Sequence, residues 1–198
     1  VHGMSTYRAI LFLPQILSMI VVGIAWRWIY APKGPLNSGL DFFGLEEVSR
    51  AWLGSFDYAL PFVGLIGTWV MFGFTMILFI AGVQKIPTEL YDAAKVDGAG
   101  PITTAFRIKI PMLIPTIKLS VFLSLLGSLQ LFDIIMPLTG GGPSNVTHSM
   151  VSYLYYFGVM RMKVGFGSAV GVVIFLICLF IAIGYQRTLM RDDNENKF

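Results

Sequence analysis

The sequence has little charge for its length. Lys, Arg, Asp and Glu make up 13% of its 198 residues, whereas soluble domains carry about 25%. Because 56% of the residues are hydrophobic, the composition indicates an integral membrane protein. The formal net charge of +3 is too small and too dispersed to indicate nucleic-acid binding, and in a membrane protein such an excess is typical of cytoplasmic loops.

The sequence also lacks the residues of the common catalytic sites. Cys178 is the only cysteine, so no disulfide forms within the chain and a cysteine-based metal cluster is excluded. The chain contains no G-x-x-x-x-G-K-S/T phosphate loop, no H-E-x-x-H zinc helix and no G-x-S-x-G nucleophile elbow. We therefore expect no enzymatic activity, no catalytic residues and no metal ligands in this chain.

Long apolar runs are what the sequence does contain. A membrane-spanning helix needs about 20 predominantly apolar residues, and four segments meet this requirement. Pro14 interrupts the first, which a bundle tolerates when neighbouring groups satisfy the freed carbonyl. The predicted fold is an all-α, polytopic transmembrane helical bundle with spans at 9–30, 60–83, 114–138 and 167–185.

The distribution of basic residues predicts the orientation of these spans. Lys and Arg accumulate in loops on the cytoplasmic side of a membrane. The loop 85–111 and the C-terminal tail are more basic than the two remaining connections, so we expect this loop and both ends of the chain to be cytoplasmic. The basic residues of the loop are Lys85, Lys95, Arg107 and Lys109, and those of the tail are Arg187, Arg191 and Lys197.

The loop 85–111 is predicted to form two short helices with a tight corner between them. Pro87 suits a first helical position, because its missing N–H has no partner there. Gly98 suits the left-handed conformation that ends a helix, and Gly100-Pro101 starts the second helix. In the first helix Leu90, Ala93 and Ala94 are spaced to form an apolar face narrow enough to enter a groove.

A family resemblance becomes specific at this loop. The order Asp92-Ala93-Ala94-x-x-Asp97-Gly98-Ala99, followed by Phe106, Ile108-x-Ile110-Pro111 and Pro115, resembles the EAA loop of membrane-spanning permease subunits of binding-protein-dependent ABC importers. Asp92 stands where the family most often has Glu, which keeps the charge and shortens its reach. The resemblance implies a coupling helix that docks on a soluble ATPase subunit, with Glu89, Asp92, Ala93, Ala94, Asp97, Gly98 and Ala99 as the coupling residues.

A second set of motifs is similar to the sugar-permease branch, the relatives of the maltose permease. It comprises Leu131-Phe132-Asp133, Leu138-Thr139-Gly140-Gly141-Gly142-Pro143 and Thr147. The resemblance implies import of sugars or polyols across a bacterial or archaeal cytoplasmic membrane. It also implies two further spans ahead of Val1, so we expect the sequence to be an N-terminally truncated, single permease domain.

The same resemblance implies the partners of the chain. They are a second homologous permease, two ATP-binding cassette subunits that hold ATP and Mg²⁺, and an extracytoplasmic solute-binding protein. The segment 140–166 and the first outer loop are the expected docking surfaces for the binding protein. No cofactor is expected on this chain itself.

Four residues are candidates for the substrate pathway. Trp69 and Phe74 on the second span are able to stack against a sugar ring, although aromatic residues in membrane helices more commonly pack or form interfacial belts. Gln130 and Asp133 lie late in the third span, where a polar group is costly and marks a pathway. Asp133 has an alternative role, since a position close to the outer interface allows a local cap or pair.

Two other classes of function remain as alternatives. A membrane-embedded lipid-processing enzyme requires clustered His, Asp or Glu at the membrane face, and the sequence shows no such cluster. A structural membrane subunit without a transport path leaves the loop 85–111 unexplained. Detection of an ATPase partner separates the permease from both.

Overall fold

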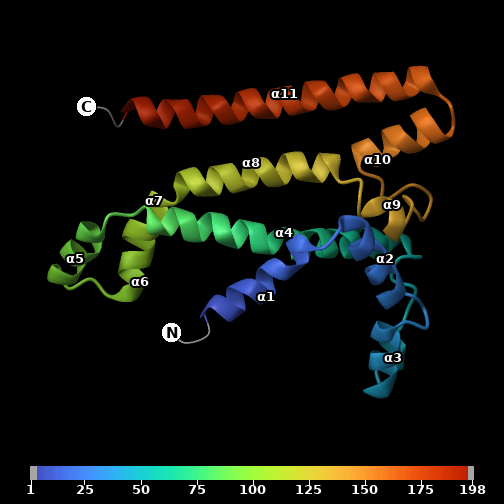
Figure 1. The fold of residues 1–198 in the computed structure, drawn as a ribbon, viewed down its shortest axis with the longest axis horizontal. Coiled ribbons are helices and arrows are strands. Elements are labelled where there is room, and N and C mark those ends of the chain that lie inside the picture. Colours follow the sequence, from blue (N-terminus) through green and yellow to red (C-terminus); the bar gives the residue numbers. More distant parts are fainter. Residues whose placement is uncertain (1–3, 196–198) are drawn as a thin grey trace. The chain divides into compact units, whose positions relative to one another are not determined.

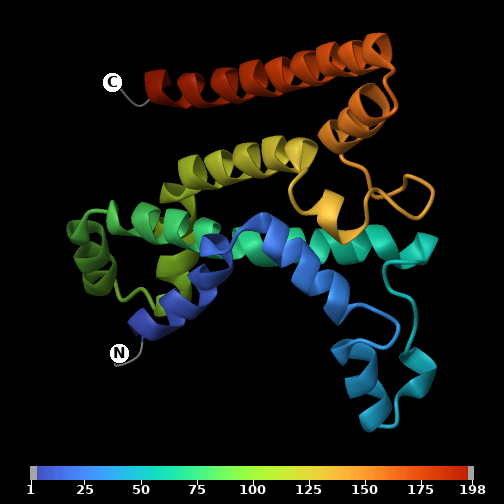
Figure 2. The same cartoon turned by 45° about the vertical axis from the view of Figure 1, so that its right-hand side comes forward.

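The computed structural model describes residues 4–195, with the side chains of residues 6–187, and every regular element in this range is helical. Lys197, which was used to predict the orientation, lies outside the described residues. His2 also lies outside them. Figures 1 and 2 show the order of the elements along the chain. The elements are α1 Met4–Ile16, α2 Met19–Ile29, α3 Pro35–Phe42, η1 Glu46–Val48, α4 Phe56–Gln84, α5 Thr88–Val96, α6 Pro101–Thr104, η2 Ala105–Lys109, α7 Ile110–Met112, α8 Ile114–Gln130, α9 Ile135–Leu138, α10 Met150–Leu154, η3 Tyr155–Met160 and α11 Val164–Glu195.

Among the described residues, two helices are each long and apolar enough to cross a membrane. They are α4 and the Val164–Arg187 part of α11, and they contain the predicted segments 60–83 and 167–185. Two pairs of helices, each bent at a short break, form two further spans if each pair crosses the membrane as one unit. The pairs are Thr6–Ile16 with Met19–Ile29, bent by 96°, and Pro101–Met112 with Ile114–Gln130, bent by 61°.

The first predicted span, 9–30, differs from the structure because it is not one helix. α1 ends at Ile16, and Ser18 has extended backbone angles (φ −59°, ψ 129°) before α2 begins. Pro14 lies in the last turn of α1, where it removes a backbone N–H and weakens the continuation of the helix. The apolar run continues through the corner, so hydropathy alone gave no sign of it.

The third predicted span, 114–138, also ends early. α8 stops at Gln130, and residues 131–134 turn the chain into the short helix α9. This turn buries Ile134 and Ile135 against α2. Close approach is possible because α2 has Gly23 at the contact, where a Cβ would lie 2.6 Å from Cγ of Pro137.

The chain folds into two compact units. One contains the chain up to Gly73 together with 127–177, and the other contains 74–126 together with the chain after Ile177. The first unit has an apolar core to which α2, α4 and α9 contribute, and four aromatic rings at one end of this core contact one another in sequence. Their centroid distances are 5.1 Å for Trp26 and Tyr30, 4.9 Å for Tyr30 and Phe62, and 4.8 Å for Phe62 and Trp52.

A buried asparagine organises the loop between α2 and α4. Asn37 is 1% exposed, and its amide nitrogen donates to the carbonyl oxygens of Pro32 (3.1 Å) and Arg50 (2.9 Å). Its side-chain oxygen accepts from the indole N–H of Trp52 at 2.7 Å. Asn37 lies on α3, a helix that the sequence did not predict, and the 3₁₀ turn η1 follows it.

The glycine corner after α9 is closed by two threonines. Gly140 and Gly141 have φ angles of +59° and +90°, which side-chain-free residues adopt without steric cost. The hydroxyl oxygens of Thr139 and Thr147 lie 2.8 Å apart, and that of Thr147 donates to the carbonyl of Gly142 at 2.7 Å. These residues belong to the motifs that resemble sugar permeases, and here they hold the corner together.

The segment 150–160 is helical and runs from α10 into the π-helical η3. It packs closely on the start of α11, because a Cβ added to Gly158 would lie 2.8 Å from the Cα of Gly167. Two glycines facing each other allow such close backbone contact in membrane helices. Gly167 therefore has a packing partner inside the chain.

The second unit contains the end of α4, the loop helices, and parts of α8 and α11. Gly82 near the end of α4 faces the start of α8, where a Cβ would lie 2.7 Å from Oγ1 of Thr116 and 2.8 Å from Cδ2 of Leu113. Phe122 on α8 stacks on Tyr185 of α11, with ring centroids 4.2 Å apart. The loop helices are thus attached to tightly packed helix ends.

Candidate functional site

Helix α5 begins and ends close to the predicted positions. Pro87 is the N-cap, with an extended ψ of 136°, so the helix begins one residue later than predicted. The φ of Gly98 is +73°, which confirms the left-handed helix end. The N–H of Gly98 donates to Lys95 O (3.1 Å) and the N–H of Ala99 to Ala94 O (2.8 Å), which is the hydrogen-bond pattern of a Schellman motif.

The two alanines of α5 face in different directions. Ala94 is buried, with 7% exposure, whereas Ala93 is exposed. The two side chains therefore do not share one exposed face in this structure, and their part in docking stays a prediction. Ala94 follows Tyr91 by three residues and shares its half-buried side of the helix. Leu90 and Ala93 remain on the open side, where Val96 adds a side chain that is 88% exposed.

The helix over 101–112 contacts α5 on the half-buried side that carries Tyr91. Lys109 in η2 places its ammonium group 5.7 Å from the ring centroid of Tyr91 on α5. Such a cation–π contact contributes about 0.5–1 kcal/mol at a partly exposed site. Leu113 at the end of this helix and Ile86 just before α5 are both buried. The contact between Lys109 and Tyr91 thus links α5 to the helix that leads into α8.

Charges are separated between the two loop helices. Glu89 and Asp92 are exposed on α5 and Asp97 caps it, whereas the chain from 98 to 132 contains no acidic residue. Lys95 is the basic residue of α5, and its ammonium group lies 3.2 Å from Asp92 Oδ1. Because both side chains are exposed, this ion pair contributes only about 0.3–0.5 kcal/mol.

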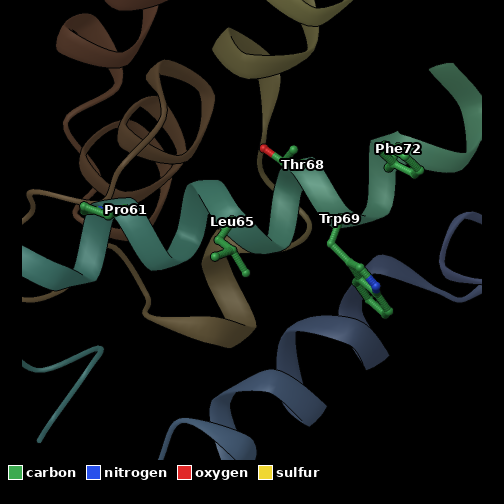
Figure 3. A pocket seen from close by; sticks show the side chains of 5 residues that line it. All are labelled: Pro61, Leu65, Thr68, Trp69 and Phe72. Atoms are coloured by element: carbon green, nitrogen blue, oxygen red, sulfur yellow. The ribbon is translucent and has the colours of Figure 1, made fainter. Parts of the chain in front are cut away.

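Trp69, a predicted pathway residue, lines an open apolar groove on α4. The groove has a volume of about 510 Å³, and Figure 3 shows its side chains along one side of the helix. The indole of Trp69 also contacts Trp26 of α2 edge-to-face at 5.4 Å, so one part of it packs and another part is open. The groove is lined by Pro61, Leu65, Thr68, Trp69 and Phe72.

The other three pathway residues do not join this groove. Phe74 lies five residues after Trp69 on α4 and is not among the lining side chains. Gln130 is the last residue of α8 and is exposed. Asp133 lies beyond the helix end, in the turn before α9, and is also exposed. Asp133 is therefore outside the regular helix α8, and both its pathway role and the alternative of a local cap or pair near the interface stay predictions.

Sequence reasoning missed Tyr91, Lys109 and Asn37. Tyr91 was detectable, because its spacing of three residues from Ala94 places both on one side of α5. Lys109 was counted only for its charge, and its contact with Tyr91 depends on how the two helices fold back on each other. Asn37 had no local signal, since its partners lie up to 15 residues away in the chain.

In the described side chains no group of three or more His, Cys, Asp or Glu residues is placed to hold a metal ion. The arrangement is one of helix ends, exposed small side chains and separated charges. Such features suit docking between proteins.

Comparison with known protein families decides the identity of the chain. Residues 6–191 match the family model described as binding-protein-dependent transport system inner membrane component. The chain belongs to this family. It is thus a membrane protein of the ABC-transporter permease class, as the loop 85–111 predicted.

Curated relatives extend over most of the chain. It is 35% identical over 178 residues to the probable ABC transporter permease protein YurN of Bacillus subtilis, covering 89% of this chain and 61% of the relative. It is 34% identical over 185 residues to the diacetylchitobiose uptake system permease protein NgcF of Streptomyces coelicolor, covering 92% of this chain and 52% of the relative. The chain therefore spans between about half and two thirds of the length of these permeases.

Solved structures of bacterial ABC transporters have the same fold. A bacterial ABC transporter involved in the import of the acidic polysaccharide alginate superposes with a TM-score of 0.81 at 25% identity, covering 94% of this chain and 68% of that chain. The alginate transporter in complex with an alginate pentasaccharide-bound periplasmic protein gives the same TM-score at 23% identity, covering 94% of this chain and 65% of that chain. The all-α permease fold predicted from the sequence is confirmed.

Proposed function

We propose that this chain is part of the permease subunit of an ATP-driven, binding-protein-dependent importer, and that α5 is its coupling helix. The observation that carries the proposal is the open side of α5. It presents Leu90 and Ala93 on a short helix whose end is fixed by Gly98. Small side chains allow a docking helix to approach closely, and a fixed end makes it a rigid element that passes on movement.

The contacts of α5 give the movement a path to the membrane helices. Tyr91 rests against Lys109 on the helix that leads into α8. Gly82 and Thr116 bring the ends of α4 and α8 into direct contact. A push on α5 therefore reaches two membrane helices through packed contacts, which suits alternating access of a pathway within the bilayer. ATP hydrolysis, with its ATP and Mg²⁺, is assigned to two separate ATPase subunits.

We infer sugars or related polyols as the transported solutes. This inference is supported by relatives named as uptake systems for diacetylchitobiose, sulfoquinovosyl glycerol and arabinooligosaccharides. The open part of Trp69 offers an apolar ring face of the kind that stacks on the C–H face of a sugar. Phe74, Gln130 and Asp133 remain candidates for other parts of the pathway.

The proposed assembly places the chain in a bacterial or archaeal cytoplasmic membrane, with the loop 85–111 and both chain ends on the cytoplasmic side. A second, homologous permease completes the pathway. A solute-binding protein docks on the outer side, at the loop after α2 and at 140–166. The alginate-bound periplasmic protein in a structural relative is an example of such a partner.

Site-specific crosslinking tests the coupling role. Cys178 is the only cysteine, so a Cys178→Ala background accepts single cysteines. Ala93→Cys is expected to crosslink to an ATPase subunit in native membranes, because Ala93 is exposed on the open side of α5. Ala94→Cys is the matched control: it is one residue away and buried, and we expect it not to crosslink. Equal crosslinking at both positions, or none at Ala93, contradicts the proposal.

Gly98→Asp provides a second test of the same role. We expect the protein to insert into the membrane but to lose the co-purifying ATPase, because the change places a second carboxylate beside the exposed Asp97 and replaces the residue that adopts this backbone without steric cost. Unimpaired recovery of the ATPase with this variant contradicts the coupling role. Mass spectrometry of the proteins that remain bound to the wild type identifies the partners.

A further inference from the structure

The helix over 101–112 has two unlike sides. Thr104, Ala105 and Ile108 are partly buried and share a side with Lys109, which contacts Tyr91. The opposite side carries large apolar side chains at four-residue spacing that no neighbour covers. They are Ile102, 75% exposed, Phe106, 67% exposed, and the less exposed Ile110.

The bend at Leu113 determines the direction of this helix. The segment Pro101–Met112 is bent by 61° from Ile114–Gln130, and Figure 1 shows α6 running across the direction of α8 rather than along it. Membrane helices are tilted on average by about 20° from the bilayer normal. With α8 tilted by that amount, a helix bent by 61° lies about 41–81° from the normal, a range that is mostly closer to the membrane plane.

The charges of the segment suit a bilayer surface. Arg107 is exposed beside Phe106, and no acidic residue occurs between 98 and 132. Amphipathic helices with basic polar residues lie in the interface, with their apolar side about 5–10 Å into the boundary of headgroups and acyl chains. The exposed apolar side chains continue into α8 through Met112 and Ile114, so the apolar row joins the surface of a membrane helix.

We propose that the 101–112 helix lies in the cytoplasmic surface of the bilayer, with Ile102 and Phe106 among the acyl chains and Arg107 at anionic lipid headgroups. The occupant of its open side is therefore lipid rather than the ATPase, which is left to α5. The proposal rests on the proposed function for the cytoplasmic orientation of the loop. It assigns opposite tasks to the two loop helices: α5 binds protein and the 101–112 helix binds the membrane.

Spin-label accessibility tests this assignment on the full-length permease subunits in vesicles of phosphatidylethanolamine and phosphatidylglycerol, before and after the ATPase is added. A nitroxide is attached to Phe106→Cys in the Cys178→Ala background, and its collisions with oxygen, which enters lipid, are compared with those with a water-soluble nickel complex. Ile102→Cys is a second position in case Phe106→Cys does not fold. Val121→Cys on α8 is the control for a membrane-helix surface, and Val96→Cys on α5, measured before the ATPase is added, is the control for the aqueous side.

We expect the ratio of oxygen to nickel collisions at Phe106→Cys to exceed that at Val96→Cys severalfold and to approach that at Val121→Cys. A nickel-dominated label contradicts the proposal, because the helix then faces water. A label that is immobile and inaccessible to both reagents also contradicts it, because a protein then covers the surface. If addition of the ATPase produces that immobility, the ATPase is the occupant.

A charge variant tests the headgroup contact. Arg107→Gln is expected to lower the oxygen-to-nickel ratio at residue 106 in vesicles containing phosphatidylglycerol and to have no effect in phosphatidylcholine alone. Lys95→Gln, on the other loop helix, is the matched control and leaves the ratio unchanged. An Arg107→Gln effect that is the same in both lipids overturns the anionic contact. Crosslinking at Ala93→Cys reads the proposed function separately, so the failure of either idea is recognised independently.

Discussion

The loop after α2 and the loop after α4 place their polar and apolar side chains in opposite ways. The loop after α2 turns its polar groups inward: Asn37 is buried and bonds to the backbone on both sides and to Trp52. The loop after α4 has an ion pair at its surface and leaves Val96, Ile102 and Phe106 exposed. The first loop is held by buried hydrogen bonds, whereas the second exposes apolar side chains that another surface is able to cover.

This difference indicates which interactions stabilise each loop. A buried, fully bonded amide fixes its surroundings, and loss of one partner leaves others unsatisfied at a cost of about 1–3 kcal/mol each. Exposed apolar side chains contribute little until something covers them. Substitutions in the loop after α2 are thus expected to reduce stability, whereas those in the loop after α4 are expected to reduce binding.

The largest effect is expected for Asn37→Ala. It removes the acceptor of the Trp52 indole N–H and the donor to Pro32 and Arg50, so the free energy of unfolding should fall by about 2–4 kcal/mol. The measurement is thermal unfolding of the purified protein in detergent, followed by tryptophan fluorescence. Ser38→Ala is the control, because Ser38 is the exposed neighbour. A stability of Asn37→Ala equal to that of Ser38→Ala contradicts the role given to the buried amide.

The next effect concerns binding and is expected for Gly98→Ala. At a φ of +73° a non-glycine residue costs about 1–2 kcal/mol, so the affinity for the ATPase should fall roughly tenfold. Gly98→Asn is the control, because asparagine tolerates the left-handed region better than alanine. No atom lies within 4 Å of an added Cβ at this position, which excludes a steric clash within the described chain. Equal affinities for the two variants indicate that the backbone conformation is not the cause.

A smaller effect on stability is expected when the pH is lowered, because His148 lies in the corner after α9. Burial lowers the pKa of His148 below its ordinary value of 6.5, and its Nε2 is buried without a hydrogen-bond partner in the described part of the chain. The unfolded chain therefore binds a proton at a higher pH than the folded one. Stability is complete above about pH 6.5 and decreases as the pH falls below it. Thermal unfolding at several pH values should show this slope, and His148→Gln should reduce it. An unchanged slope refutes the assignment.

The smallest effect is expected for Asp92→Asn on α5. It removes the ion pair with Lys95, whose contribution on an exposed helix is below about 0.5 kcal/mol. Thermal unfolding should therefore change little, while crosslinking at Ala93→Cys decreases if the carboxylate takes part in docking. Unchanged crosslinking removes Asp92 from the coupling residues. A large loss of stability instead contradicts the comparison between the two loops.

The sequence predicted best those features that depend on single residues and their neighbours. Gly98 and Gly100-Pro101 placed the corner between the two loop helices correctly, because left-handed turns and proline starts have local causes. The apolar runs located α4 and α11, since composition reports the surrounding solvent of a helix. Composition does not reveal where the helix axis changes direction, so the corner at Ser18 and the early end of α8 were missed.

The features that were missed depend on residues distant in the chain. Ala94 is buried by groups outside α5, which spacing within α5 alone does not reveal. Asn37 and Trp52 are 15 residues apart and meet only when α3 has formed. Trp69 was correctly placed on α4, but its division between packing on Trp26 and an open groove required the position of α2.

The π-helical turn at 105–109 determines where the 101–112 helix tolerates a change in chain length. A π-helix accommodates more residues per turn than an α-helix, so loss of one residue within the turn restores the ordinary form and leaves the flanking segments close to their present directions. In a helix of 3.6 residues per turn, loss of one residue elsewhere rotates the chain before it by about 100°. A deletion at 110–112 would therefore turn Ile102 around the helix axis relative to α8, whereas a deletion at 105–109 would leave it nearly unchanged. The direction of Ile102 is thus set by the number of residues outside the π-helical turn.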